Sequence, residues 1–250
     1  MKITIEALPG IPEVKKDDDL VLLIVDALAR CGRTSVDGDI FVIAQKIVSK
    51  AEGRQVRLAT VKPSREAINI ARKVDKDPHL VELILGETEE VVRQRKGALI
   101  TASRLGLVHA NAGVDSSNIA GRDSALLLPV DPDASAKRIR QGLEARFGVR
   151  LGVIVSDSMG RAWRNGTVGF AIGASGVETL RNLVGTPDRF GRLLKITTVG
   201  LGDGLAAAAC VVMGEADEGT PVALIRGLPP METHQTAANL QRPKDEDLFR

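Results

Sequence analysis

Aromatic side chains are nearly missing from this chain of 250 residues. They make up 2% of it, with one tryptophan and no tyrosine. Proteins that bind single-stranded nucleic acids use aromatic rings as platforms for the bases, so the composition argues against that class. The formal net charge of +2 is also too small for a general nucleic-acid or membrane surface. We therefore expect no nucleic acid and no membrane among the partners.

Cysteines, histidines and long apolar runs are scarce as well. Cys31 and Cys210 are the only cysteines, which predicts no disulfide framework and fits a reducing cytoplasm. The three histidines stand far apart, without the spacing of a zinc site. The apolar runs 20–25 and 205–213 are too short to span a bilayer, and we see no signal peptide. These features predict a cytoplasmic protein.

The rest of the composition is that of an ordinary globular protein. The chain is 44% hydrophobic and 26% charged, and it is long enough to bury a sizeable core. Apolar periodicity and turn residues predict alternating strands and helices. We expect strands over 2–7, 40–44, 97–102, 106–110, 151–155, 193–200 and 221–226, and helices over 19–31, 64–74, 79–94, 135–147, 177–184 and 205–213. This pattern predicts a mixed α/β protein of the α+β class. We expect a single domain over 1–250, and a division of that domain into two lobes would also fit the sequence.

Chemistry concentrates in residues 151–176. A buried strand is predicted to end in Ser156, Asp157 and Ser158, which offer hard oxygen donors of the kind that Mg²⁺ or Mn²⁺ binds. Glycines and the pair Arg161 and Arg164 follow, and arginine binds carboxylates and phosphates in fork geometry. A metal and anion site is our first hypothesis. The same residues also fit a strand, a turn and a glycine-rich connection with solvated arginines.

Three other segments add candidate ligands. The loop 111–118 follows a predicted strand and offers Asp115 to a metal and Asn118 to a ligand, although it also fits a turn or a helix cap. The acidic loop 214–219 contains Glu215, which would complete a metal cluster or lie in solvent as an ordinary loop acid. Lys50 lies in the run 45–54, which fits either phosphate pairing or an edge strand with solvated charges.

Taken together, these segments resemble the coenzyme F420-0:L-glutamate ligase (γ-glutamyl ligase) family. The matching pieces occur in the family's order through most of the chain. They are GIPEV at 10–14, VSKAEGR at 48–54, NAGVDSSN at 111–118, SDSMGRAWRNGTVGFAIG at 156–173 and VMGE at 212–215. The match covers the ligase domain alone, and we expect none of the additional flavin-reductase-like domain that some relatives carry at the C-terminus.

The resemblance implies a ligase that consumes GTP and adds L-glutamate to coenzyme F420-0. The terminal carboxylate of F420-0 would be phosphorylated by GTP, and the amine of glutamate would attack the resulting acyl phosphate to form a γ-linked amide. The family also implies two Mg²⁺ or Mn²⁺ ions per site, with K⁺ as a further candidate ion, and an intertwined homodimer.

The family's site residues carry over position by position. Asp115 and Asp157 resemble ligands of one ion and are the catalytic candidates, while Ser158 and Glu215 resemble ligands of a second ion. The residues that resemble nucleotide contacts are Ile11, Pro12, Glu13, Val14, Ala44, Gln45, Lys50, Asn118, Met213, Gly214, Glu215, Ala216, Asp217, Glu218, Gly219 and Thr220.

Several positions depart from the family pattern. Relatives have two small hydroxyl residues where this chain has Ala44 and Gln45, which leaves the base preference open between GTP and another nucleotide. Met159 and Gly204 replace Asn and Glu, and Ser158 replaces the more frequent Thr with the same hydroxyl donor. The number of glutamates added is open as well.

Two other functions use the same residues. A metal-dependent nucleotide or phosphate-ester hydrolase would need the same acids, and a non-catalytic nucleotide-binding module would need only the binding loops. No histidine is an obvious base for the incoming amine, and we expect His109, beside the loop 111–118, to be structural.

Overall fold

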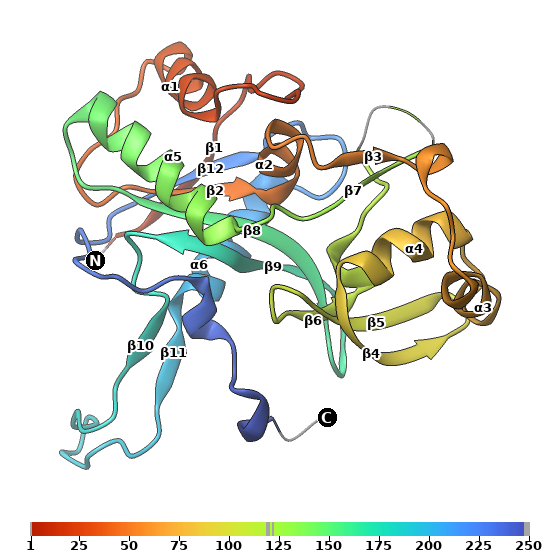
Figure 1. Ribbon diagram of the computed structural model, residues 1–250. Helices are drawn as coiled ribbons and strands as arrows, with labels where there is room; N and C mark the ends of the chain where they lie inside the picture. The colour runs from red at the N-terminus through yellow and green to blue at the C-terminus, as the bar shows by residue number, and fades with distance from the viewer. Residues whose placement is uncertain (1, 119–120, 122, 248–250) are drawn as a thin grey trace.

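A five-stranded sheet forms the centre of the computed structural model, which describes residues 2–118, 121 and 123–247 (Figure 1). Its strands lie in the order β1 (Thr4–Ala7), β12 (Val222–Arg226), β2 (Ile40–Ala44), β8 (Gly152–Arg161) and β9 (Arg164–Ser175). Strands β2 and β8 are parallel, and the other neighbours are antiparallel. Strand β2 is buried on both faces, which explains why its sequence is a continuous apolar run.

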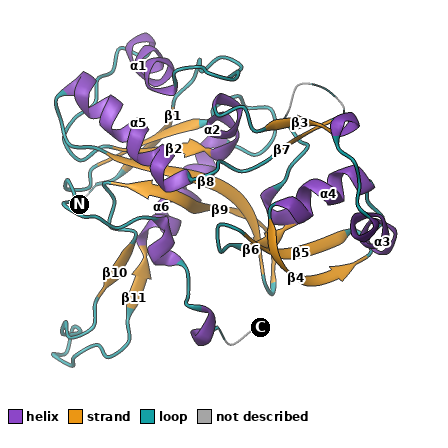
Figure 2. Ribbon diagram, in the orientation of Figure 1, coloured by secondary structure: helices purple, strands orange, loops and turns teal. Residues whose placement is uncertain are grey.

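Helices cover both faces of this sheet, as Figure 2 shows. One face carries α1 (Leu20–Arg30), α2 (Gln45–Ala51) and α5 (Pro132–Phe147), and the other carries α6 (Leu201–Met213). Alternation along β2 supplies the two cores: Phe41 and Ile43 pack toward α1 and α5, whereas Ile40 and Val42 pack toward α6. None of the helices among the described residues is long and apolar enough to cross a membrane.

A third hydrophobic core lies beside the central sheet. Helices α3 (Arg65–Val74) and α4 (Pro78–Gly86) pack on the antiparallel strands β4 (Thr88–Arg95), β5 (Ala98–Ser103) and β6 (Val108–Ala110). The ribbon β3 (Gln55–Arg57) and β7 (Ser124–Leu126) joins the two parts. Side chains cap both helices, since Ser64 Oγ accepts a hydrogen bond from Ala67 N and Asp77 Oδ1 accepts one from His79 N.

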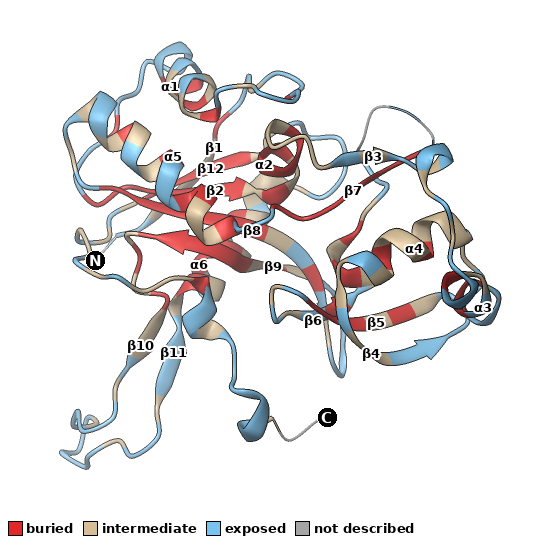
Figure 3. Cartoon of the chain, in the orientation of Figure 1, coloured by how far each residue is buried: buried red, intermediate tan, exposed pale blue. Residues whose placement is uncertain are grey.

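The remaining elements are short. Strands β10 (Leu180–Asn182) and β11 (Thr198–Gly200) form the base of an arm, residues 180–200, that projects from the body and is coloured mostly exposed in Figure 3. The 3₁₀ turns are η1 (Leu58–Thr60), η2 (Asn111–Gly113), η3 (Ala237–Leu240) and η4 (Lys244–Glu246).

The mixed α and β architecture agrees with the prediction, but several elements differ. The run 45–54 begins with helix α2 and is not an edge strand, because Ile47 and Val48 pack into the core on one side of a helix. The segment 177–184 contains strand β10 and no helix, and only 198–200 of the strand predicted over 193–200 is observed. The helix predicted over 79–94 stops at Gly86, and Thr88–Arg95 is strand β4.

The stretch 151–176 is a long hairpin, not a glycine-rich connection. Gly169 and Gly173 lie within β9 and permit close packing. A Cβ atom on Gly169 would lie 2.5 Å from the carbonyl oxygen of Ala206 in α6, and one on Gly173 would collide with the backbone of Pro132 at the start of α5. These glycines therefore serve helix packing.

Candidate active site

Three strand ends and the middle of a fourth strand meet at one side of the central sheet. Because β2 and β8 are parallel, the carboxyl end of β2 lies beside the middle of the longer β8, with Ala44 opposite Ser156. Strand β12 is antiparallel to β2 and therefore begins at this edge, while β1 is antiparallel to β12 and ends there. Segments from four distant parts of the sequence are thus brought side by side. The carboxyl ends of parallel strands are a frequent place for ligand sites in α/β proteins.

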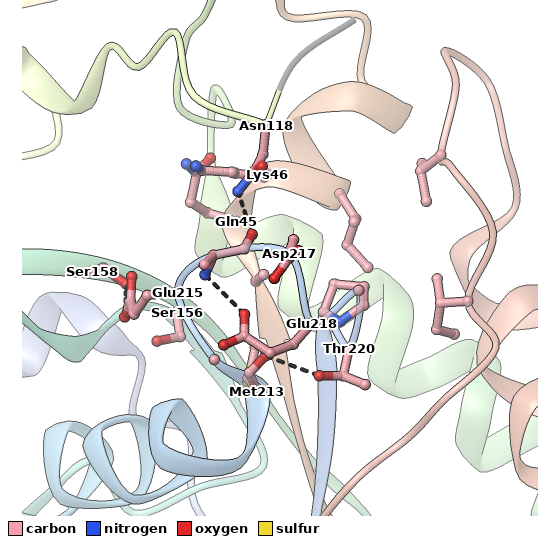
Figure 4. Close-up of a pocket in the computed structure, with 18 of the residues that line it drawn as sticks. Gln45, Lys46, Asn118, Ser156, Ser158, Met213, Glu215, Asp217, Glu218 and Thr220 are labelled. Carbon is pink, nitrogen blue, oxygen red and sulfur yellow. Dashed lines mark hydrogen bonds between the residues drawn. The ribbon is translucent and has the colours of Figure 1, made fainter.

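A cavity of about 640 Å³ opens at this edge (Figure 4). All of the predicted nucleotide-contact residues line it: Ile11, Pro12, Glu13, Val14, Ala44, Gln45, Lys50, Asn118 and each residue from Met213 to Thr220. The volume falls within the range of small-molecule sites. The sheet topology therefore collects into one pocket the segments that the sequence singled out separately.

The candidate metal ligands lie in and beside this pocket. Asp157, Ser158 and Glu215 line it, and Figure 4 shows Ser158 and Glu215 together on one side. Ser158 Oγ donates a hydrogen bond of 2.6 Å to Glu215 Oε1. Asp115 lies one contact further away, because its Oδ2 is paired at 2.7 Å with Nζ of the lining residue Lys46.

Electrostatics around the two aspartates differ. Burial raises the pKa of Asp157 to about 7, and the negative charge of Asp115 also raises it. Hydrogen bonds from Ser158 N and Gln45 lower this pKa, as does the positive charge of Lys46, but they do not outweigh burial. Burial also acts to raise the pKa of Asp115, but hydrogen bonds from Lys46 and Ser117 outweigh it, so that this pKa is lowered. The charged form of Asp157 is therefore unfavourable in this site, and a bound cation would stabilise it.

The donor set fits divalent ions that are completed by substrate oxygens. Among the residues that the structure describes, no group of three or more His, Cys, Asp or Glu side chains is close enough to enclose an ion by itself. The predicted sets are smaller than that, with two aspartates for one ion and a hydroxyl with a glutamate for the other. Mg²⁺ is usually held by one or two carboxylates, with water and phosphate oxygens filling its other positions.

Hydrogen bonds hold the walls of the pocket together. Lys50 Nζ is paired with Glu13 Oε1 at 2.7 Å, which joins α2 to the segment 11–14. Asn118 Nδ2 donates to the carbonyl oxygen of Ala216 at 3.0 Å and joins its own loop to the acidic loop. Thr220 Oγ1 donates to the carbonyl oxygen of Met213 at 2.9 Å, which closes the segment 213–220 on itself.

Some outcomes differ from the sequence analysis. Lys46 and Cys210 line the pocket but were not predicted, and Cys210 Sγ donates a 2.6 Å hydrogen bond to Glu215 Oε1. Ser156, one of the oxygen donors that the sequence offered, also lines it. A helical reading of 45–51 would have found Lys46, because residues four apart share a helix face and Lys50 was already a candidate. Arg161 and Arg164 do not line this pocket, since the hairpin carries them to its far turn.

His109 is buried, and burial lowers its pKa to about 4. Among the described residues its Nε2 finds no hydrogen-bond partner, and the residue does not line the pocket. These observations favour the structural role that the sequence analysis expected.

Comparison with known proteins decides the family. A model of the F420-0:gamma-glutamyl ligase family matches residues 10–227. The chain belongs to this family. A coenzyme F420:L-glutamate ligase of Methanothermobacter thermautotrophicus is 44% identical over the full length of both chains. One of Methanocaldococcus jannaschii is 49% identical over 86% of this chain and 85% of its own.

A third relative of the same description, from Methanopyrus kandleri, is 45% identical over 99% of this chain and 98% of its own. The resemblance to this ligase family is thus confirmed across the chain. As a member of an F420-0:gamma-glutamyl ligase family, the chain is assigned to the ligases.

Proposed function

We propose that this protein joins L-glutamate to coenzyme F420-0 through a γ-linked amide bond at the expense of GTP. Family membership supports the ligase reaction, and the observation that carries the proposal is the single pocket lined by all the candidate nucleotide contacts. A nucleotide can be gripped there by Lys50, by Asn118 and by backbone groups of the segments 11–14 and 213–220.

The proposed chemistry has two steps. A carboxylate oxygen of F420-0 attacks the γ-phosphorus of GTP, which forms an acyl phosphate and releases GDP. The amine nitrogen of L-glutamate then attacks the acyl carbon, phosphate leaves with the bonding electron pair, and the nitrogen loses a proton. Phosphoryl transfer depends mainly on positioning and on neutralising charge, so this chemistry needs no nucleophilic side chain.

We further propose that Asp115 and Asp157 hold one Mg²⁺ or Mn²⁺ ion and that Ser158 and Glu215 hold a second. Such ions would supply charge neutralisation on the transferred phosphoryl group. The chain's own contribution is to fix these donors on the sheet edge: Asp157 and Ser158 belong to β8, and Glu215 follows α6 directly.

A homodimer is part of the proposal, and the arm supports it. Phe190, Leu193 and Ile196 are 82%, 63% and 88% exposed. Apolar side chains gathered on a projecting segment are unfavourable in water and are typical of surfaces that pack against another chain. We propose a second copy of this chain as the partner. We also propose the cytoplasm as the location, because Cys31 and Cys210 are free cysteines.

Coupling of nucleotide turnover to amide formation tests the proposed reaction. GDP release should be slow with GTP and Mn²⁺ alone and should rise when both F420-0 and L-glutamate are present, with and without K⁺ in parallel. If the rate of GDP release is the same with and without L-glutamate and F420-0, the protein is instead a hydrolase.

A further inference from the structure

Lys46 holds a position that its neighbours in the pocket do not share. It is the second residue of α2, and α2 begins where β2 ends at the pocket edge. Its Nζ lies 2.7 Å from Asp115 Oδ2 and 2.7 Å from Ser117 Oγ, with the carbonyl oxygen of Ser117 at 3.4 Å. The three protons of the ammonium group thus all face the loop that carries Asp115.

The two oxygens of Asp115 are engaged differently. Oδ1 accepts a hydrogen bond of 2.8 Å from the backbone of Ser117, which fixes the turn. Oδ2 accepts a hydrogen bond of 2.8 Å from Ser117 Oγ and also faces Lys46. The ammonium group therefore occupies the side of Asp115 on which a cation would approach the carboxylate.

From this geometry we infer that Lys46 is the resident counter-ion of Asp115 and competes with a divalent ion for that carboxylate. This inference rests on the proposed function, which places Asp115 among the metal ligands. Lys46 and a metal ion cannot both contact Oδ2 at full strength, because both are cations and would repel each other. Binding of the ion therefore requires the ammonium group to turn away from Asp115.

Once it has left Asp115, the ammonium group of Lys46 can pair with the phosphates of the proposed nucleotide. Its side chain lines the pocket in which we propose the GTP phosphates bind, and 26% of it is exposed. Lysine is a flexible point charge that pairs well with phosphoryl oxygens. Lys46 would then keep the acid cluster neutralised before the ion arrives and add positive charge to the phosphates afterwards.

Lys50 provides a matched control, because it is paired with a different carboxylate from Lys46. It also lies on α2 and lines the same pocket, four residues further along, but its Nζ is paired with Glu13. Removing either lysine takes one positive charge from the pocket. Only the Lys46 substitution takes that charge off Asp115.

Titration of the nucleotide-free protein with Mn²⁺, followed by calorimetry and by the signal of free Mn²⁺ in electron paramagnetic resonance, tests the inference. Lys46→Met should bind Mn²⁺ roughly three- to tenfold more tightly than the wild type, the factor expected for losing a partly exposed ion pair. Lys50→Met should change the affinity less than about twofold, because its charge is directed at Glu13. Lys46→Arg, which keeps the charge, should bind Mn²⁺ as the wild type does.

Ligation kinetics with the same variants test the second half. Lys46→Met should lower kcat for glutamate addition by at least about tenfold despite its tighter Mn²⁺ binding, because a charge on the phosphates is lost. A purely structural lysine would weaken Mn²⁺ binding and activity together. Equal or weaker Mn²⁺ binding by Lys46→Met would overturn the inference while leaving the proposed ligase intact. A wild type that binds no Mn²⁺ would overturn the metal part of the proposed function and the competition with it.

Discussion

Asp157 is a residue whose position favours function over stability. It stands near the end of the buried part of β8, and burial raises its pKa to about 7. A folded-state pKa above the unfolded value means that the folded protein is destabilised as the pH rises from about 4 to 7 and the carboxyl group loses its proton in the buried site. A nearby divalent ion would reverse this penalty, which is consistent with a role as a metal ligand.

We expect Asp157→Asn to lower turnover by at least about 100-fold, because a proposed metal ligand is lost. In protein free of metal and nucleotide at pH 8, the same substitution should raise the Tm by a few degrees, because the unfavourable charge is gone. Asp133→Asn is the control. Asp133 Oδ1 accepts hydrogen bonds from Ala174 N and Ala237 N outside the pocket, so this variant should lower the Tm and keep the turnover. Unchanged turnover in Asp157→Asn would rule Asp157 out as a metal ligand.

His109 should make the folded protein less stable as the pH falls, whereas Asp157 makes it less stable as the pH rises. Its pKa of about 4 in the folded protein lies below the ordinary 6.5, so the unfolded chain takes up the proton first as the pH falls. The free energy of unfolding should therefore fall by about 3 kcal/mol between pH 6.5 and pH 4 on account of this residue.

Denaturant unfolding at pH 7, 5 and 4 would measure that slope. His109→Gln should lose this part of the slope, whereas the exposed His79→Gln should keep it. An identical slope in the wild type and in His109→Gln would contradict the assignment.

At the scale of elements, α6 connects the sheet to the pocket. It packs on β9 at Gly169, and it ends at Met213, where the pocket segment 213–220 begins. A side chain at Gly169 meets the backbone of Ala206, which cannot turn aside as a flexible side chain could. The position of α6 therefore decides the position of Glu215.

Gly169→Ala should lower the free energy of unfolding by about 1–3 kcal/mol and weaken GTP binding, because α6 must shift outward. Gly204→Ala lies on the same helix and faces open space, and it should raise the free energy of unfolding by up to about 1 kcal/mol with GTP binding unchanged. Chemical denaturation and nucleotide titration of both variants would check this contrast. Equal effects of the two substitutions would contradict the packing argument.

The same scale shows what the sequence could predict. The helix over 135–147 carries periodic apolar residues, whereas those over 19–31 and 205–213 contain continuous apolar runs. The first two of these helices in the chain follow capping aspartates, Asp19 and Asp131. Helix α2 was missed because it has only seven residues, too few for a clear period, and it is stabilised by burial of Ile47 and Val48. Missing this helix meant missing Lys46.

The candidate site was predictable in composition but not in arrangement. The family motifs indicated the segments that line the pocket, yet a sequence does not state that the ends of β1, β2 and β12 lie beside the middle of β8. That result depends on strand order, which short-range patterns do not encode. It also depends on long-range contacts such as that between Asn118 and Ala216, which are 98 residues apart.

At the scale of the whole molecule, the arm 180–200 exposes apolar side chains that nothing in the monomer covers among the described residues. Replacing Phe190 and Ile196 by Ser should convert a dimer to a monomer in light scattering coupled to gel filtration, because apolar contact area is lost. The monomer fold should survive, since both side chains are more than four-fifths exposed. Val211→Ser, at an 83% exposed position on α6, is the control and should leave the dimer intact. A dimer that survives both arm substitutions would show that the arm is not the interface.

The central claim is that this pocket couples GTP to glutamate addition on F420-0. Mass spectrometry of a reaction that contains the protein, F420-0, L-glutamate, GTP and Mn²⁺ tests it most directly. We predict a product heavier than F420-0 by one or more glutamyl units that requires both GTP and the metal, and the mass will show how many units are added. GTP consumption without any glutamylated product would contradict the account.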